Sequence, residues 1–131
     1  MSHASGTIES KSYNFQPLEE LENGSKLLFM SAIDLFHGDI EGEARAEFVA
    51  VLFKDNTSVF AGMYRFRGTV GDRKGTFLLE VNGSSDVKGI SQGTWAVVPN
   101  SGTAALVGLK GTGKFSYQSN GPSALSLDYE L

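Results

Sequence analysis

The chain has 131 residues, a formal net charge of −4 and no cysteine. This length suits a single domain, and the lack of cysteine excludes disulfides, thiolate metal sites and thiol nucleophiles. Neither half of the chain carries a basic cluster that could neutralise several phosphates, so we expect no nucleic-acid partner. No apolar run approaches the roughly 20 residues of a membrane span, so we expect no membrane partner. No signal peptide is evident, and we therefore expect a cytoplasmic location.

Alternating apolar and polar residues, interrupted by Gly, Asn, Asp and Ser, predict an all-β chain with eight strands. The predicted strands span about 4–13, 27–38, 43–53, 58–70, 74–82, 87–98, 111–118 and 124–131. Between the first two, "PLEELENG" (17–24) could form one helical turn, and "TAALVGL" (103–109) either a short helix or a loop that plugs one end. Eight antiparallel strands can close into an up-and-down barrel or form a two-sheet sandwich. The short connections favour the barrel, which also removes exposed strand edges.

Strand parity predicts which side chains face the barrel interior. The predicted inward residues are Ala44, Ala46, Phe48, Ala50 and Leu52, then Phe60, Gly62, Tyr64, Phe66 and Gly68, then Phe77, Leu79 and Val81. Alternating small and bulky residues of this kind suit a small, tapered barrel. Parity is undecided in 27–38, where both faces are largely apolar. We therefore expect a neighbouring subunit or the N-terminal segment to cover part of the outer wall, which makes a homo-oligomer one alternative.

Four stretches also resemble a known family. "FHGDIEGEARAEF" (36–48), "FAGMYRFRGTVGDRKGTF" (60–77), "GTWAVVPNSGTAALVGLKGTGKF" (93–115) and "LSLDYEL" (125–131) are similar, in order, to short uncharacterised bacterial proteins that carry a domain of unknown function. The resemblance implies an allene-oxide-cyclase-like, lipocalin-like barrel of eight antiparallel strands. Plant allene oxide cyclases isomerise a fatty-acid epoxide inside such a barrel, but their catalytic residues match no position here. Tyr64 stands where relatives often have a glutamate.

The stretch "DLFHGDIEGEARAEF" (34–48) concentrates ionisable residues. It is either a metal or acid/base site or the tip of a hairpin with a solvated charged face. A metal site needs several converging ligands, and His37 is the only histidine outside the N-terminal tail. We favour the hairpin, in which Asp39 and Glu41 satisfy turn backbone. In the following strand, Glu43, Arg45 and Glu47 then form an outward row of alternating charge.

Aromatic residues give the strongest functional lead. The candidate ligand-binding residues are Phe48, Phe60, Tyr64, Phe66, Phe77, Trp95, Phe115 and Tyr117. Arg65 either faces outward and pairs with Glu43, Glu47 or Glu80, or enters the lumen as an anchor for an anionic ligand if a bulge reverses its parity. A small barrel is either filled by side chains or hollow enough for one small ligand, and the sequence leaves both open.

We predict that the barrel binds a small hydrophobic or aromatic molecule, without a cofactor or metal. Tyr64 and Trp95 are expected to orient it, while Phe48, Phe66 and Phe77 supply contact area. Two alternatives are an isomerase or cyclase that acts on a hydrophobic substrate inside the barrel, and a non-catalytic protein whose barrel is filled. The sequence assigns no catalytic residue.

Overall fold

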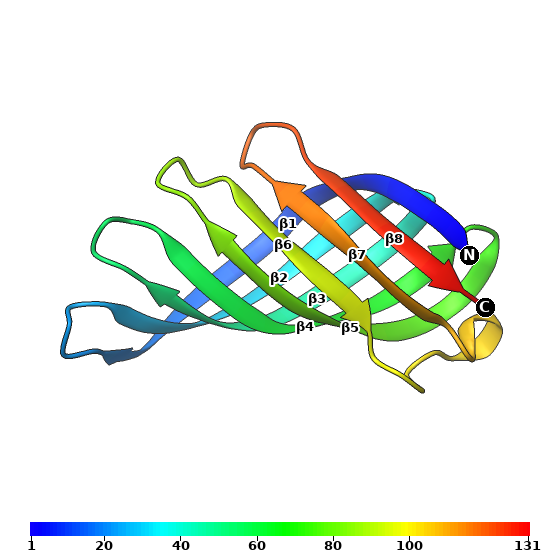
Figure 1. The fold of residues 1–131 in the computed structure, drawn as a ribbon, viewed down its shortest axis with the longest axis horizontal. Coiled ribbons are helices and arrows are strands. Elements are labelled where there is room, and N and C mark those ends of the chain that lie inside the picture. The colour runs from blue at the N-terminus through cyan, green and yellow to red at the C-terminus, as the bar shows by residue number, and fades with distance from the viewer.

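Eight antiparallel strands form a closed barrel in which each strand pairs with its neighbours in the chain and β1 also pairs with β8 (Figure 1). This computed structural model describes residues 1–131. The strands are β1 (Ser2–Glu20), β2 (Lys26–Gly38), β3 (Ile40–Leu52), β4 (Ser58–Val70), β5 (Arg73–Ser85), β6 (Ser91–Val97), β7 (Lys110–Tyr117) and β8 (Ala124–Glu130). The predicted fold class and all eight predicted strands are confirmed.

The two largest differences from the predicted boundaries lie at the end of β1 and at the start of β6. Residues 17–20 continue β1 and form no helical turn, because β2 offers them a paired edge, with Pro17 opposite Leu28 and Glu20 opposite Lys26. Residues 87–90 precede β6 as a turn, because the side chain of Asp86 accepts hydrogen bonds from the Lys88 and Ile90 amides at 2.9 and 3.0 Å.

The two ends of the barrel are built differently. One end carries both termini and the long β6–β7 connection with its 3-10 helix η1 (Ala104–Leu106) (Figure 1). Leu106 and Leu109 from this connection are buried and pack against the core that includes Phe66 and Phe77. Of the two alternatives for 103–109, the structure combines both: a 3-10 helix of three residues lies in a loop whose Leu106 and Leu109 close this end. The opposite end is framed by the β1–β2, β3–β4, β5–β6 and β7–β8 loops (Figure 1).

The structure shows which face of β2 points into the barrel. Asp34 and Phe36 are buried and point inward, so Phe29, Ile33 and Leu35 belong to the outer wall. At the open end this wall is apolar across three strands, where Phe29 lies opposite Val49, and Val49 opposite Ala61. The N-terminal segment does not cover it, because that segment is β1 itself, a strand of the barrel.

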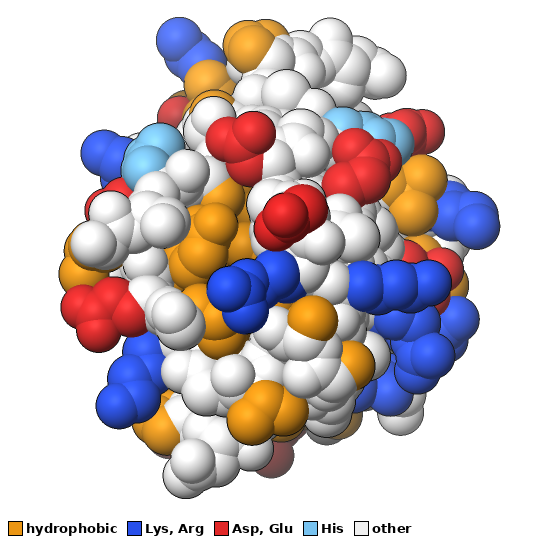
Figure 2. Space-filling view, turned by 90° about the vertical axis from the view of Figure 1, so that its right-hand side faces the viewer, with side chains coloured by type: hydrophobic (Ala, Val, Ile, Leu, Met, Phe, Trp, Pro, Cys, Tyr) orange, Lys and Arg blue, Asp and Glu red, His pale blue; other side chains and the backbone are white.

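The outer surface is otherwise mixed in charge. Seen from the closed end, acidic and basic side chains are interspersed with apolar ones (Figure 2). In β3, the predicted row of alternating charge is confirmed, since Arg45 donates to Glu43 at 2.9 Å and Arg65 of β4 donates to Glu47 at 2.8 Å. No helix in the molecule has the length and apolar character needed to cross a membrane.

Candidate functional site

The open half of the barrel is hollow. A cavity of about 360 Å³ opens between the four loops at that end. It is lined by Ile8, Ser10, Tyr13, Phe15, Met30, Ala32, Asp34, Phe48, Ala50, Ser58, Phe60, Tyr64, Ser85, Ser91, Phe115, Tyr117 and Ser119. The apolar side chains form most of the wall, while five serines, from β1, β4, β5, β6 and the β7–β8 loop, contribute hydroxyl groups. This combination is typical of a site for a small apolar ligand.

Glycines on neighbouring strands make room for the cavity's phenylalanine rings. Three rings each lie against a glycine that faces them across a strand pair: Phe48 against Gly62, Phe60 against Gly83, and Phe115 against Gly93. A β-carbon on Gly83 would stand only 2.4 Å from the Phe60 ring, a distance that real β-carbons do not reach. The glycines thus let the rings rest against the wall, which leaves the middle of the barrel free.

The floor of the cavity is a layer of packed aromatic rings. Tyr64 packs edge-on against Phe48 and Phe36, with ring centroids 5.4 Å apart in each pair. Below it, Trp95 lies 5.6 Å from Phe36 and 5.0 Å from Phe115, and its indole N–H donates to the Ser126 carbonyl at 2.9 Å. These contacts fix the floor by shape and by a satisfied polar group.

One carboxylate stands at this floor. The Tyr64 hydroxyl donates a hydrogen bond to Oδ2 of Asp34 at 2.5 Å, and Asp34 makes no other side-chain hydrogen bond. No fully buried side-chain oxygen in the molecule lacks a partner, so Oδ1 of Asp34 lies at the cavity surface. The pair therefore presents one fixed and one available carboxylate oxygen to the lumen.

The environment of this pair shifts both pKa values. Burial raises the pKa of Asp34 above its ordinary 3.8, and the hydrogen bond from Tyr64 opposes part of that rise. Burial, together with the neighbouring Asp34, raises the pKa of Tyr64 well above 10.0. Tyr64 thus keeps its proton and directs it to Asp34. A carboxyl with a raised pKa in an apolar cavity marks a candidate functional site.

The structure brings together five of the nine residues predicted from sequence. Phe48, Phe60, Tyr64, Phe115 and Tyr117 line the cavity. Trp95, Phe66 and Phe77 are buried in the packed half, so they support the floor and do not line the cavity. The expectation that Trp95 orients a ligand stays a prediction; its ring lies behind the cavity lining, packed against Phe36 and Phe115.

Arg65 lies on the outer wall. Its Nε and guanidinium nitrogen donate to Glu47 at 3.1 and 2.8 Å, and its parity follows the rest of β4 without a bulge. The alternative in which it enters the lumen is therefore wrong, while the predicted outward pairing with Glu47 is confirmed.

Sequence reasoning missed Asp34, the polar centre of the cavity. The signal was present in "SAIDLF" (31–36), where one acid interrupts an apolar run, but parity in this strand was ambiguous. Met30 was missed because it lies in the same strand of ambiguous parity. Tyr13 and Phe15 were missed because a register shift between Ser10 and Ser12 of β1 changes which of the following side chains face inward.

A second depression lies on the outer wall over β5 to β8. It measures about 470 Å³ and is lined mostly by polar residues such as Glu80, Thr94, Thr112, Lys114 and Asp128. It has neither the apolar wall nor a buried polar group, so the lumen is the stronger candidate.

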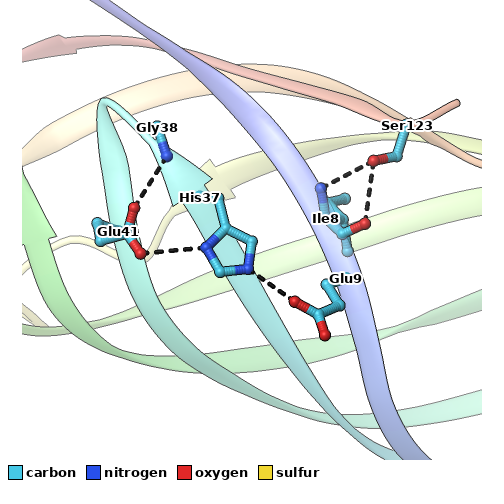
Figure 3. Close-up of polar contacts among 6 residues, drawn as sticks. All are labelled: Ile8, Glu9, His37, Gly38, Glu41 and Ser123. Atoms are coloured by element: carbon cyan, nitrogen blue, oxygen red, sulfur yellow. Dashed lines mark hydrogen bonds and ion pairs between the residues drawn. The ribbon is translucent and has the colours of Figure 1, made fainter.

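The ionisable cluster around His37 is the predicted hairpin tip (Figure 3). On the outer face, His37 Nε2 contacts Glu9 at 2.9 Å and Nδ1 contacts Glu41 at 3.1 Å. Glu41 also accepts the Gly38 amide, so it satisfies turn backbone as predicted, whereas Asp39 accepts the amide of Ser5 in the neighbouring strand β1. Because carboxylates only accept hydrogen bonds, both ring contacts are complete only when the imidazole is protonated.

We expect the pKa of His37 to lie above its ordinary value of 6.5, because a hydrogen bond to Glu9 raises it and a second one, to Glu41, raises it further. The stabilisation from protonated His37 is then present below the unfolded-state pKa and is lost as pH rises through the higher folded-state value. NMR titration of the His37 ring in a His3→Gln background measures this pKa. Glu9→Gln and Glu41→Gln should each lower it, and a wild-type value at or below 6.5 would contradict the assignment.

Comparison with known proteins places the chain among relatives of unknown function. The family described as protein of unknown function, DUF3224, matches residues 4–129. A crystal structure at 1.84 Å of a protein with unknown function from the DUF3224 family of Shewanella oneidensis MR-1 is similar in fold, with a TM-score of 0.79 and 22% sequence identity. The alignment covers 100% of this chain and 97% of that chain. No curated protein matches the sequence.

Proposed function

This chain belongs to the DUF3224 family of proteins of unknown function, and we propose that it binds a small hydrophobic or aromatic molecule in the open half of the barrel. The observation that carries the proposal is the apolar cavity of about 360 Å³ above a closed, packed floor. This volume lies within the range of small-molecule sites, roughly 300–1,000 Å³.

The architecture favours binding over a purely structural role. A barrel of eight strands can be filled by its own side chains, and the lower half of this one is. In the upper half, small residues such as Ala32 and Ala50 face the lumen, and rings lie back against glycines. Apolar surface facing an open cavity gains stability when a ligand covers it.

Binding can be tested with N-phenylnaphthylamine, a neutral apolar fluorophore that brightens when it leaves water. We expect saturable binding of one molecule per chain by the wild type. Ala32→Phe places a ring in the lumen directly above Asp34 and should weaken binding by about tenfold or more, a loss of roughly 1.4 kcal/mol.

Ala61→Phe is the matched control, because Ala61 lies on the outer wall of β4. It should leave the affinity unchanged. Circular dichroism and thermal unfolding verify that both variants are folded. Unsaturable fluorescence in the wild type, or equal affinity in Ala32→Phe, would overturn lumen binding.

Asp34 favours a second candidate function, an isomerase or cyclase that acts on a hydrophobic substrate in the same cavity. Its carboxyl lines the cavity and its pKa is raised by burial, and both features suit a group that takes a proton from a substrate and returns it. Turnover of a bound substrate that Asp34→Asn abolishes, while binding persists, would select this function over binding alone.

A further inference from the structure

The lumen is lined by one acidic side chain, Asp34, and by no basic one. From this we propose a ligand class: an apolar molecule that presents a protonated amine to Asp34, in preference to one that carries a carboxylate. This inference rests on the proposed function, since it specifies the ligand of the same cavity.

The cavity lining contains an acidic side chain but no basic one. Asp34 is the only acidic residue in its lining, and no lysine, arginine or histidine lines it. Its other ionisable residues are Tyr13, Tyr64 and Tyr117. A carboxylate ligand would lose its hydration without gaining a basic partner, and it would be repelled by the Asp34 carboxylate. An ammonium group would instead be attracted to that carboxylate, in a site of low dielectric constant.

The geometry of Asp34 suits a donor from the ligand. Tyr64 occupies Oδ2 and fixes the plane of the carboxyl group, while Oδ1 stands at the cavity surface. Asp34 is 9% exposed, so few competing waters can surround Oδ1. Because ammonium is a donor only, it completes the hydrogen bonding of this oxygen with a charge-assisted contact.

Aromatic side chains supply the rest of the recognition. Phe48, Phe60 and Phe115 line the cavity above Asp34, with Phe48 and Phe60 stacked at 5.4 Å between ring centroids. Ring faces attract cations as well as apolar groups. The cavity thus combines a carboxylate base with aromatic walls, which matches a flat apolar body that ends in an amine.

Binding should also depend on pH in a defined direction. Burial raises the pKa of Asp34, and a bound ammonium favours the charged carboxylate and lowers that pKa again. The ionisable group that contacts Asp34 is the hydroxyl of Tyr64, which keeps its proton because its own pKa lies well above 10.0. Tyr13 and Tyr117 are the other ionisable residues in the lining. Amine affinity should therefore fall as pH drops through the pKa of Asp34 in the free protein.

Three ligands of the same shape test the inference by isothermal titration calorimetry near neutral pH. They are naphthylmethylamine, naphthylmethanol and naphthoate, which present a cation, a neutral hydroxyl and an anion. We expect the amine to bind most tightly and naphthoate most weakly, with about tenfold or more between them, as for other pairs of close opposite charges. In Asp34→Asn, where the side-chain oxygen can still accept the Tyr64 hydrogen bond, the amine and the alcohol should bind within about threefold of each other.

The outcomes separate this inference from the proposed function. If the alcohol binds but the amine binds no better than naphthoate, the ligand class is wrong and lumen binding stands. If Asp34→Asn is folded and keeps the amine preference, the assignment to Asp34 is wrong. If none of the three ligands binds and N-phenylnaphthylamine does not bind either, the proposed function fails together with the ligand class.

Discussion

Replacing Phe36 with alanine is expected to lower the free energy of unfolding by about 3–5 kcal/mol. The Phe36 side chain is fully buried at the centre of the barrel, below the cavity. Its ring centroid lies 5.4 Å from that of Tyr64, 5.8 Å from Phe66 and 5.6 Å from Trp95. Truncation removes all three contacts and leaves a void, because the surrounding strands are held by their ladders and cannot collapse into it.

Urea unfolding measured by Trp95 fluorescence gives this loss directly. Phe15→Ala is the matched control, since it removes the same atoms from a ring that is 50% exposed at the cavity mouth. Its cost should stay below about 1 kcal/mol. A Phe36→Ala protein as stable as Phe15→Ala would show that the packed floor is not the centre of the core.

The strands and the outer charge row could be predicted because both depend on period-two alternation. In β3, every second residue from Ala44 to Ala50 is buried, and Glu43, Arg45 and Glu47 lie outside, as expected. Alternation fails where both faces are apolar. In β2, the interrupted apolar run around Asp34 did not decide which way this side chain points, since an acid is normally placed in water and the hydrogen bond from Tyr64 supports its inward position.

The height of a residue along the barrel could not be predicted either. Parity places Phe66 and Phe77 correctly inside, but whether they line a cavity depends on the stagger between strands and on where the plug at Leu106 ends. Stagger is a property of the closed sheet as a whole. The sequence therefore predicted an aromatic interior, but only the three-dimensional structure shows that one half of this interior is packed and the other half is hollow.

Replacing Tyr64 with phenylalanine should cost about 1–3 kcal/mol near neutral pH, the usual penalty for a buried acceptor that loses its donor. The phenyl ring keeps the packing against Phe48 and Phe36, so the variant removes little besides the hydroxyl. Asp34→Asn and the double variant complete a thermodynamic cycle. In Asp34→Asn the acceptor is neutral, so Tyr64→Phe should cost less there than in the wild type.

The pH dependence of that cost tests the role of the carboxylate. Because burial raises the pKa of Asp34 in the folded state, ionised Asp34 destabilises the fold, and stability should be greater below the unfolded-state pKa and fall as pH rises through the folded-state value. Tyr64 moderates that fall through its hydrogen bond, which lowers the pKa of Asp34. In Tyr64→Phe the pKa of Asp34 therefore rises further, and the two proteins should differ least in acid and most near neutral pH. Urea unfolding across this range measures the difference; a penalty that is the same at all pH values would show that the hydroxyl acts through packing alone. A carboxylate that reduces stability in the free protein, and that a cationic ligand would neutralise, is the expected signature of a residue placed for binding.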